Sequence, residues 1–171
     1  MRTGVLLPHS LAAGSSHDLV SWARTAEDLG FDILGIRGRI THDSLEPLVA
    51  LSLVAASTRR IELVLHVPAL HLTQPRILAR QIGSLDRASR GRLNVVVGAA
   101  DDRWTFTDRD GRARCVAVVD LQPSQGAELD GVREALDLIE RGGADDVLLS
   151  PPSGDLRALE RLIELRTAAR V

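Results

Sequence analysis

The chain has 171 residues, 44% of them hydrophobic, so it is long enough for one domain with a buried core. All 21 basic residues are arginines, and the 23 acidic residues leave a net charge of -2. Without lysine the chain can form neither a Schiff base nor the lysine contact of a P-loop. Without a basic excess, nucleic acid is not an expected partner.

The cysteine count and the hydropathy pattern indicate in which cellular compartment the protein is expected. Cys115 is the single cysteine, so it can form neither an internal disulfide nor a multi-thiolate metal site. The sequence does not open with a charged and then apolar leader. Its longest strongly apolar stretch, Leu45–Ala56, is interrupted by polar residues and is too short to span a membrane. We therefore expect a cytoplasmic protein with no membrane partner.

Short apolar runs alternate with helical periodicity through the first hundred residues. Each run is too short for a helix and lacks polar alternation, which is typical of buried parallel strands. In chain order we expect a strand at Gly4–Pro8, a helix at His17–Gly30, a strand at Asp32–Arg37, a helix at Leu45–Thr58, a strand at Ile61–Pro68, a helix at Gln74–Ser89 and a strand at Leu93–Gly98. This alternation predicts a parallel sheet with helical crossovers.

The alternation stops at Asp101–Arg114, a polar segment with turn residues that we expect to form a loop or hairpin. It then resumes with a strand at Cys115–Asp120, a helix at Leu129–Arg141, a strand at Asp145–Ser150 and a helix at Asp155–Ala169. A closed eight-stranded TIM-type barrel takes about 250 residues. The sequence therefore predicts a single domain, 1–171, with about six mainly parallel strands. We interpret it as an incomplete or shortened TIM-type (β/α) barrel in which 101–114 replaces missing barrel units, with an open sheet as the alternative.

Several short motifs follow one another in a characteristic order. They are Ala26–Asp32 (AEDLGFD), Glu46-Pro47, Ala55–Ile61 (AASTRRI), Ser84–Arg92 (SLDRASRGR) with the strand after it, and the tail Gly126–Pro151. Together they resemble the bacterial luciferase-like family of flavin- and deazaflavin-dependent oxidoreductases, which are α/β barrels. The resemblance implies an oxidoreductase, in many members a monooxygenase, that uses FMN or a deazaflavin coenzyme on a small-molecule substrate.

The positions that contact the coenzyme in this family differ here. The family's Asp-His pair after strand two aligns with Gly38 and Arg39. Its Gly-Thr-Gly bulge beside the isoalloxazine ring aligns with Val64, Leu65 and His66. Glycine lets a backbone approach a ring closely, whereas branched side chains obstruct it. The alternative function is therefore a non-redox binding or structural module, or a repurposed enzyme, on a truncated luciferase-like barrel without flavin.

Ligands of parallel α/β folds bind at the carboxyl ends of the strands, and this selects the candidate site residues. Under the resemblance, Arg39 stands near the reactive ring and His66 beside it, as the candidate catalytic pair. The candidate cofactor-binding residues are His9, His71, Gly98 and Arg103, the last near a phosphate. The opposing interpretation is that His66 is a hydrogen-bonded core histidine and that Arg37 and Arg39 are solvated charges.

A metal site can be drawn from His9, His66, His71 and Asp101, because imidazole and carboxylate are suitable ligands for zinc or iron. Nothing in the spacing of these residues requires such a site. We therefore expect that the protein holds no metal.

The helix expected at 45–58 is apolar on nearly all sides, whereas a helix that covers a sheet in a monomer needs one apolar stripe. Missing strands also leave sheet edges that proteins normally cover or pair. We therefore expect a homodimer through helix 45–58, and similar helices form the dimer interface in the family that the sequence resembles. A heteromer with a full-length relative is the alternative.

Overall fold

A computed structural model describes residues 1–8, 16–38, 45–67, 74–98, 103–108, 110–121, 136–151 and 153–169. The strands are β1 (Arg2–Leu6), β2 (Ile33–Arg37), β3 (Glu62–Val67), β4 (Leu93–Val97), β5 (Arg103–Thr107), β6 (Ala113–Asp120) and β7 (Asp146–Ser150). The helices are α2 (Ser16–Asp28), α3 (Pro47–Ser57), α4 (Pro75–Ala88) and α6 (Leu156–Ala169). Residues 136–141 are also helical, within the helix expected at 129–141.

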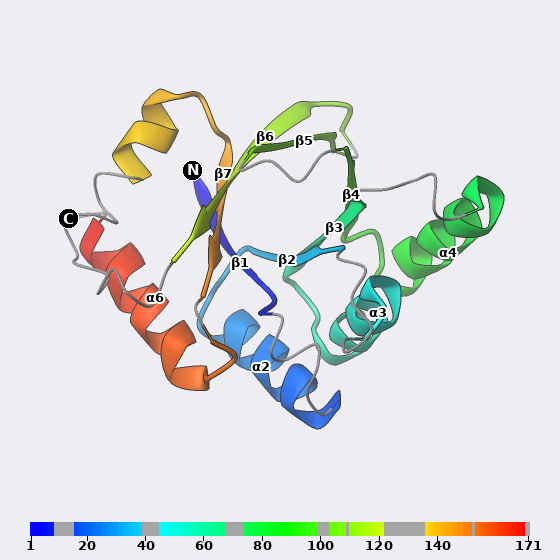
Figure 1. Ribbon diagram of the computed structural model, residues 1–171, viewed down its shortest axis with the longest axis horizontal. Coiled ribbons are helices and arrows are strands. Elements are labelled where there is room, and N and C mark those ends of the chain that lie inside the picture. The colour runs from blue at the N-terminus through cyan, green and yellow to red at the C-terminus, as the bar shows by residue number, and fades with distance from the viewer. Residues whose placement is uncertain are drawn as a thin grey trace.

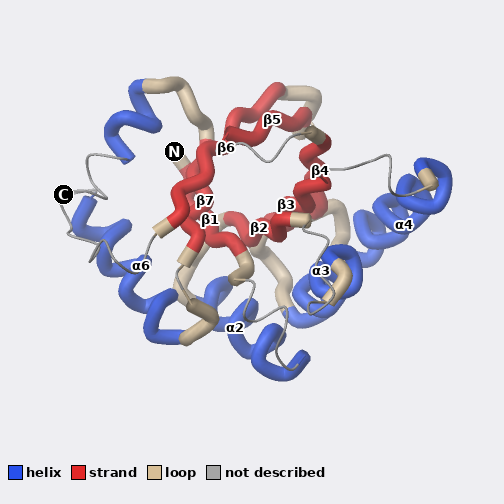
Figure 2. Tube along the Cα trace, viewed as in Figure 1, coloured by secondary structure: helices blue, strands red, loops and turns tan. Residues whose placement is uncertain are grey.

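The strands form one sheet in the order β4-β3-β2-β1-β7-β6-β5, in which every pair is parallel except β5 and β6. The sheet curls until its end strands β4 and β5 lie side by side, and the described helices lie outside the ring (Figures 1 and 2). The predicted shortened TIM-type barrel is therefore confirmed. The expected strand count was one too low, because the segment expected as a loop or hairpin contains β5, which pairs with β6. None of the helices that the structure describes is long and apolar enough to cross a bilayer.

Successive strand residues point alternately into the barrel and out toward the helices. The outward residues, such as Leu34, Leu63 and Leu149, join the helices in one large apolar cluster. The inward residues form a second cluster, which consists of Leu6, Ile33, Val64, Val96, Trp104, Phe106, Val116, Val118 and Leu148. Since a barrel of few strands is narrow, its interior is filled by side chains and forms a core rather than a pore.

Two interior glycines make room for this packing. A Cβ on Gly4 would lie 2.5 Å from Cδ2 of Leu148, and a Cβ on Gly35 would lie 2.9 Å from both Leu148 and Leu6. Real Cβ atoms do not approach other atoms this closely, so any side chain at either position would displace the leucines. The two glycines therefore let neighbouring strands carry large residues in a narrow barrel.

A network of polar side chains closes the amino end of the barrel interior. Asp146 of β7 is fully buried and accepts hydrogen bonds from Arg2 of β1 (Nε to Oδ1, 3.0 Å) and from Arg114 of β6 (2.5 and 2.6 Å). Arg2 also pairs with Glu62 of β3 at 2.6 Å, and Glu62 accepts a 2.9 Å bond from Asn94 of β4. Burial alone lowers the pKa of Arg2. The hydrogen bonds and negative charges of Asp146 and Glu62 raise it by more than burial lowers it, so the net shift of the pKa is upward. The network joins five strands.

Replacement of Asp146 tests this network. Asp146→Asn leaves Arg2 and Arg114 without their shared charge in the interior, so we expect the free energy of unfolding to fall by about 3–5 kcal/mol. The matched control is Asp137→Asn, because Asp137 is 54% exposed and faces Arg141 at 3.8 Å on one helix. We expect that control to change stability by at most about 0.5 kcal/mol. Urea unfolding of the three proteins measures both values, and equal losses in the two variants would contradict the account.

The turns at the amino end of the barrel are held by Glu27 and Arg92. The carboxylate of Glu27, at the end of α2, accepts the backbone N–H groups of Arg59, Arg60 and Ile61 at 2.6–3.0 Å. The guanidinium of Arg92 donates to backbone carbonyl groups at the end of α3, before β3 and after α4. Three of the motifs quoted above therefore join helices to the strands that follow them. We call the hydrogen bonds of Glu27 and Arg92 to the backbone the amino-end seams.

The Glu27 seam predicts a pH dependence of stability. Burial raises the pKa of Glu27, but its three backbone hydrogen bonds outweigh burial and hold the pKa below the ordinary 4.5. The folded state therefore binds fewer protons than the unfolded state. The stabilisation is fully present above the unfolded pKa and is lost as the pH falls through the lower folded pKa. From about pH 6 to about pH 3 the unfolding free energy of the wild type should fall more than that of Glu27→Gln.

Urea unfolding at several pH values measures this difference, and Glu160→Gln is the control because Glu160 is an exposed residue of α6. The control should follow the wild-type curve. If Glu27→Gln follows it too, the hydrogen bonds to residues 59–61 do not stabilise the fold.

Candidate functional site

The carboxyl ends of the parallel strands meet at one edge of the barrel, here called the carboxyl edge. His66 in β3 and Gly98 directly after β4 lie at this edge, as expected. Arg103 begins β5, whose antiparallel direction brings that backbone position toward the same edge, but its side chain is not among those described. The remaining predicted site residues lie outside the described residues: Arg39, His9 and His71. The structure thus tests the geometry of only part of the predicted set.

His66 and Gly98 are in direct contact. The His66 side chain is 0% exposed, and its Nε2 lies 3.2 Å from the carbonyl oxygen of Gly98. Since a carbonyl oxygen can only accept, Nε2 carries the hydrogen and donates it. Gly98 has a φ of +144°, a conformation that favours glycine, and a Cβ there would meet no heavy atom of the described residues within 4 Å. The bond ties the ends of β3 and β4 together.

An aromatic stack fills the barrel just inside the carboxyl edge. The rings of His66 and Trp104 lie 4.7 Å apart between centroids with 9° between their planes. Trp104 comes from β5 and is 1% exposed, so both rings belong to the interior. The geometry agrees with a core role for His66, because a histidine with no exposed surface reaches a ligand only through its neighbours.

A cation lies next to the stack. Arg37 ends β2 and pairs in register with His66. Its guanidinium carbon lies 5.9 Å from the ring centroid of Trp104, within the range of a cation-π contact. One of its terminal nitrogens lies 3.4 Å from Oδ2 of Asp120, the last residue of β6. The described part of the edge therefore combines two buried stacked rings, those of His66 and Trp104, with the ion pair of Arg37 and Asp120. We call the two stacked rings the aromatic floor.

Sequence reasoning missed Trp104. Its segment was read as a polar loop or hairpin, so neither of its aromatic residues was placed in the core. The order Trp104-Thr105-Phe106-Thr107 nevertheless alternates aromatic and β-branched residues, which is the pattern of a strand with one buried face. Trp104 and Phe106 are buried and both threonines are exposed, as that pattern predicts.

The residues of the edge decide how a flavin-type coenzyme could fit. The bulge that the resemblance implies is absent, because β3 pairs in unbroken register with β2 and with β4. Val64 and His66 point inward there, and Trp104 stacks on His66, so a ring inserted deep beside β3 does not fit. For a coenzyme lying across the edge, the described residues offer the positive charge of Arg37 and the position of Gly98, where a Cβ would meet no described atom within 4 Å.

The described residues give no support for a metal centre. No group of three or more His, Cys, Asp or Glu side chains within the described ranges is arranged to hold a metal ion. Of the set that the sequence allows, only His66 belongs to those ranges, and its Nε2 is bonded to Gly98.

A family model described as luciferase-like monooxygenase matches residues 1–147 of the chain. The matched region includes β1 to β6, the carboxyl edge and both seam residues at the amino end, Glu27 and Arg92. Among curated proteins none matches the chain.

Solved structures share the fold. The coenzyme F420 dependent tetrahydromethanopterin reductase from Methanopyrus kandleri is 25% identical, with a TM-score of 0.50 over 58% of this chain and 27% of the reductase. The oxygenating constituent of 3,6-diketocamphane monooxygenase from Pseudomonas putida, in complex with FMN, is 23% identical, with a TM-score of 0.51 over 59% and 30%. A monooxygenase from Streptomyces bottropensis is 20% identical, with a TM-score of 0.53 over 88% and 70%. The chain thus spans less than a third of the length of the first two.

The family match extends over most of the chain, and the barrel, its strand order and its amino-end seams provide the physical basis for it. The chain therefore belongs to the luciferase-like monooxygenase family.

Proposed function

We propose that this chain is a luciferase-like oxidoreductase that binds FMN or a deazaflavin coenzyme across the carboxyl edge and acts on a small-molecule substrate. The observation that carries the proposal is the carboxyl edge itself. There the stacked rings of His66 and Trp104 lie beside the guanidinium of Arg37, and a Cβ on Gly98 would meet no described atom within 4 Å. Family membership supports it. The names of the similar structures support it too, since one is coenzyme F420 dependent and another is in complex with FMN.

The proposal gives the predicted residues distinct roles. Arg39 lies near the reactive ring and Arg103 near the phosphate, while His9 and His71 are further contacts at the same edge. His66 does not contact the coenzyme but acts as a positioning residue. It holds the ring of Trp104 by stacking, and it holds the end of β4 through its hydrogen bond to Gly98. When bound, the coenzyme supplies hydride transfer or oxygen activation, and the protein orients it and excludes water.

The second candidate is a barrel that has left flavin chemistry and serves as a binding module or a repurposed enzyme. The observation that favours it is the unbroken register of β3, together with the Trp104 ring in the interior beside it. Fold alone does not carry an activity, so a family member can keep the barrel and lose the coenzyme.

Equilibrium titration separates the two candidates. FMN and a deazaflavin coenzyme are added separately to the purified wild type, and ligand fluorescence is followed. Saturable binding in the low micromolar range is expected for one of them. Arg39→Ala should weaken that binding by about tenfold, the loss of one charge-assisted contact. His66→Ala should weaken it as well, because it removes support for the floor.

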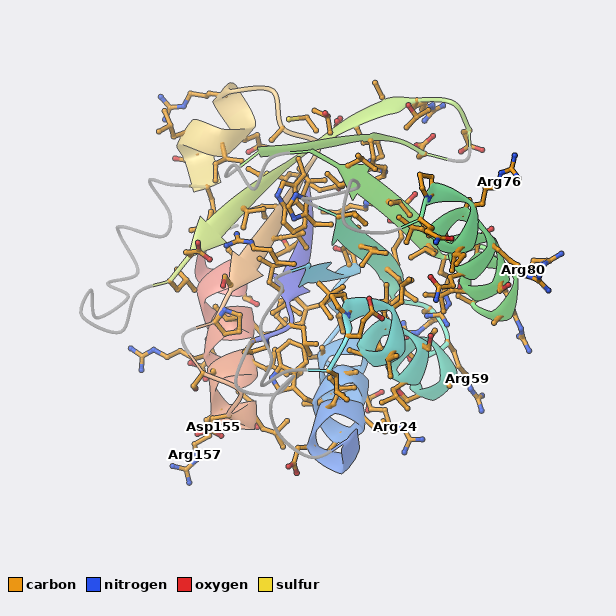
Figure 3. All side chains as sticks on the ribbon, turned by 45° about the vertical axis from the view of Figure 1, so that its right-hand side comes forward. Arg24, Arg59, Arg76, Arg80, Asp155 and Arg157 are labelled. Atoms are coloured by element: carbon orange, nitrogen blue, oxygen red, sulfur yellow. The ribbon has the colours of Figure 1, made fainter. Side chains whose placement is uncertain are left out.

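Arg157→Ala is the matched control, because Arg157 is an exposed arginine at the start of α6 (Figure 3). It should bind as the wild type does. Circular dichroism and urea unfolding confirm that each variant is folded before its affinity is compared. No binding of either coenzyme by the folded wild type would reject the oxidoreductase proposal in favour of the second candidate.

We also propose a cytoplasmic location. The single cysteine, Cys115, is free and half-buried in β6, and no pairing within the chain stabilises the fold. This composition suits a reducing compartment.

We propose further that the protein is a homodimer through α3. A groove of about 930 Å³ runs between α3 and α4. Val49 of α3 and Ile77 of α4 line it, and each is 51% exposed. α4 stands away from the barrel and buries only Leu78 and Leu85 (Figure 1). An apolar groove of this size on a protruding helix pair is typical of a contact surface.

Charge favours a second copy as the occupant of the groove. Glu46 lies at the α3 side, and Arg76 and Arg80 lie at the α4 side, where they extend from the exposed face of α4 (Figure 3). In a two-fold contact the same patch meets itself, so the arginines of one copy can pair with Glu46 of the other. The α3 surface between these charges carries small residues, Ser52 and Ala56, which permit close helix packing.

Sedimentation or light scattering at micromolar concentration tests the dimer. Val49→Glu places an unpaired charge in the apolar contact, so we expect the dimer dissociation constant to rise at least about tenfold. Leu138→Glu is the control, because Leu138 is 71% exposed and lies outside the groove. A monodisperse wild-type monomer would reject the homodimer, and a complex formed only with a longer family member would favour the heteromer.

A further inference from the structure

The arginines at the two ends of the barrel have different partners. At the amino end, Arg2 and Arg114 share the fully buried carboxylate of Asp146 through bonds of 2.5–3.3 Å. At the carboxyl edge, the Arg37 side chain is 14% exposed, and among the described residues its charge has a single carboxylate contact, the 3.4 Å approach of Asp120. Asp120 is itself 41% exposed, so water weakens the attraction. Arg37 is therefore a largely buried cation with a weak partner.

Unused donors lie at the same place. Within the described part of the chain, Nε of Arg37 is buried and makes no hydrogen bond. The indole Nε1 of Trp104, the ring over which Arg37 lies, is also buried without a hydrogen bond. Buried donors without acceptors are costly, and few native structures keep them without a reason. Two other described donors, Nε1 of Trp22 and Nε of Arg114, are also buried without a hydrogen bond, but Arg37 and Trp104 are in contact with each other. Two such donors in one contact point to an acceptor that arrives from outside the chain.

We propose that Arg37 is the centre of an oxyanion-binding site at the carboxyl edge, which takes the carboxylate or phosphate group of a small ligand. A guanidinium presents its donors as a fixed fork that matches an oxyanion in two bonds. The terminal nitrogen toward Asp120 is engaged, whereas Nε is buried and still has a hydrogen to donate, so the Arg37 side chain turns toward the edge when the ligand binds. The ligand replaces the long contact to Asp120 with shorter bonds, and Asp120 is a competing anion that holds Arg37 in place when the ligand is absent.

This proposal shares Arg37 and Trp104 with the proposed coenzyme site, but it does not rest on coenzyme binding. It requires only Arg37, Trp104 and Asp120, and an oxyanion without a flavin ring suffices to test it. A protein that binds no FMN or deazaflavin can still bind an oxyanion here. A protein that binds a coenzyme can likewise fail to bind an isolated oxyanion, so the two proposals fail separately.

The test uses the emission of Trp104. Trp22→Phe leaves Trp104 as the only tryptophan of the chain. This variant is titrated with sodium acetate and, separately, with inorganic phosphate, each against sodium chloride at matched ionic strength so that screening is constant. We expect a saturable change in emission with at least one oxyanion. The tighter of the two identifies the site as one for planar carboxylates or for tetrahedral phosphates.

Two further variants, made on the same background, assign the effect. Asp120→Asn removes the competing anion, so binding should tighten about two- to fivefold. Arg37→Met removes the fork and should weaken binding by at least about tenfold. The proposal is overturned if both proteins, Trp22→Phe alone and Trp22→Phe with Asp120→Asn, show no saturable change in emission with either oxyanion. It is equally overturned if folded Arg37→Met gives the same curve as its parent.

Discussion

The shortened barrel depends on one buried carboxylate. Asp146 lies in the last strand, is fully buried, and accepts bonds from Arg2 in the first strand and Arg114 in the strand on its other side. With seven strands and an antiparallel hairpin in place of further β-α units, the sheet must still curl far enough to bring β4 beside β5. A charged cluster that joins five strands at one end and glycines that admit large residues in the middle make the narrow interior solid.

The two ends of the barrel have different tasks. At the amino end, Glu27 and Arg92 use backbone hydrogen bonds to join helices to the strands that follow them. At the carboxyl edge, the described polar contacts are longer, at 3.2 Å for His66 and Gly98 and 3.4 Å for Arg37 and Asp120. Conventional barrels divide stability and ligand binding between their ends, and our proposals assign ligand binding to the carboxyl edge in the same sense. The family motifs in this sequence belong mostly to the stable end, which explains how a chain can keep the family pattern while its coenzyme positions change.

Much of the fold could be predicted from the sequence because parallel strands are short, apolar and separated by helical periods. The strands at Asp32–Arg37 and Leu93–Gly98 were placed to within about one residue, a margin at which assignment methods themselves differ. β5 was missed because its flanks are polar and the interpretation of a loop outweighed the alternation at Trp104 and Phe106. The network around Asp146 could not be predicted, since its members are far apart in the chain and meet only once the barrel closes.

The candidate site was only partly predictable. The rule that ligands bind at strand carboxyl ends selected both His66 and Gly98, and the structure places them at the carboxyl edge with a bond between them. Their proposed roles stay predictions. The same rule could not reveal that His66 is fully buried beneath Trp104, because stacking depends on a strand that the sequence did not announce as one. Arg37 and Asp120 were visible as strand-end charges. Their pairing follows from the order β2-β1-β7-β6 and from inward alternation, which only the closed barrel supplies.

The central proposal is that ligands bind this barrel at the carboxyl edge, whereas the amino end only stabilises the fold. Backbone amide shifts of the isotope-labelled protein, recorded by NMR during addition of FMN or acetate, test that claim most directly. The account predicts shifts concentrated at Arg37, Gly38, Gly98 and Asp120, with the amides of residues 59–61 unchanged. Shifts concentrated at the amino end or in the α3–α4 groove, with none at the carboxyl edge, would contradict it.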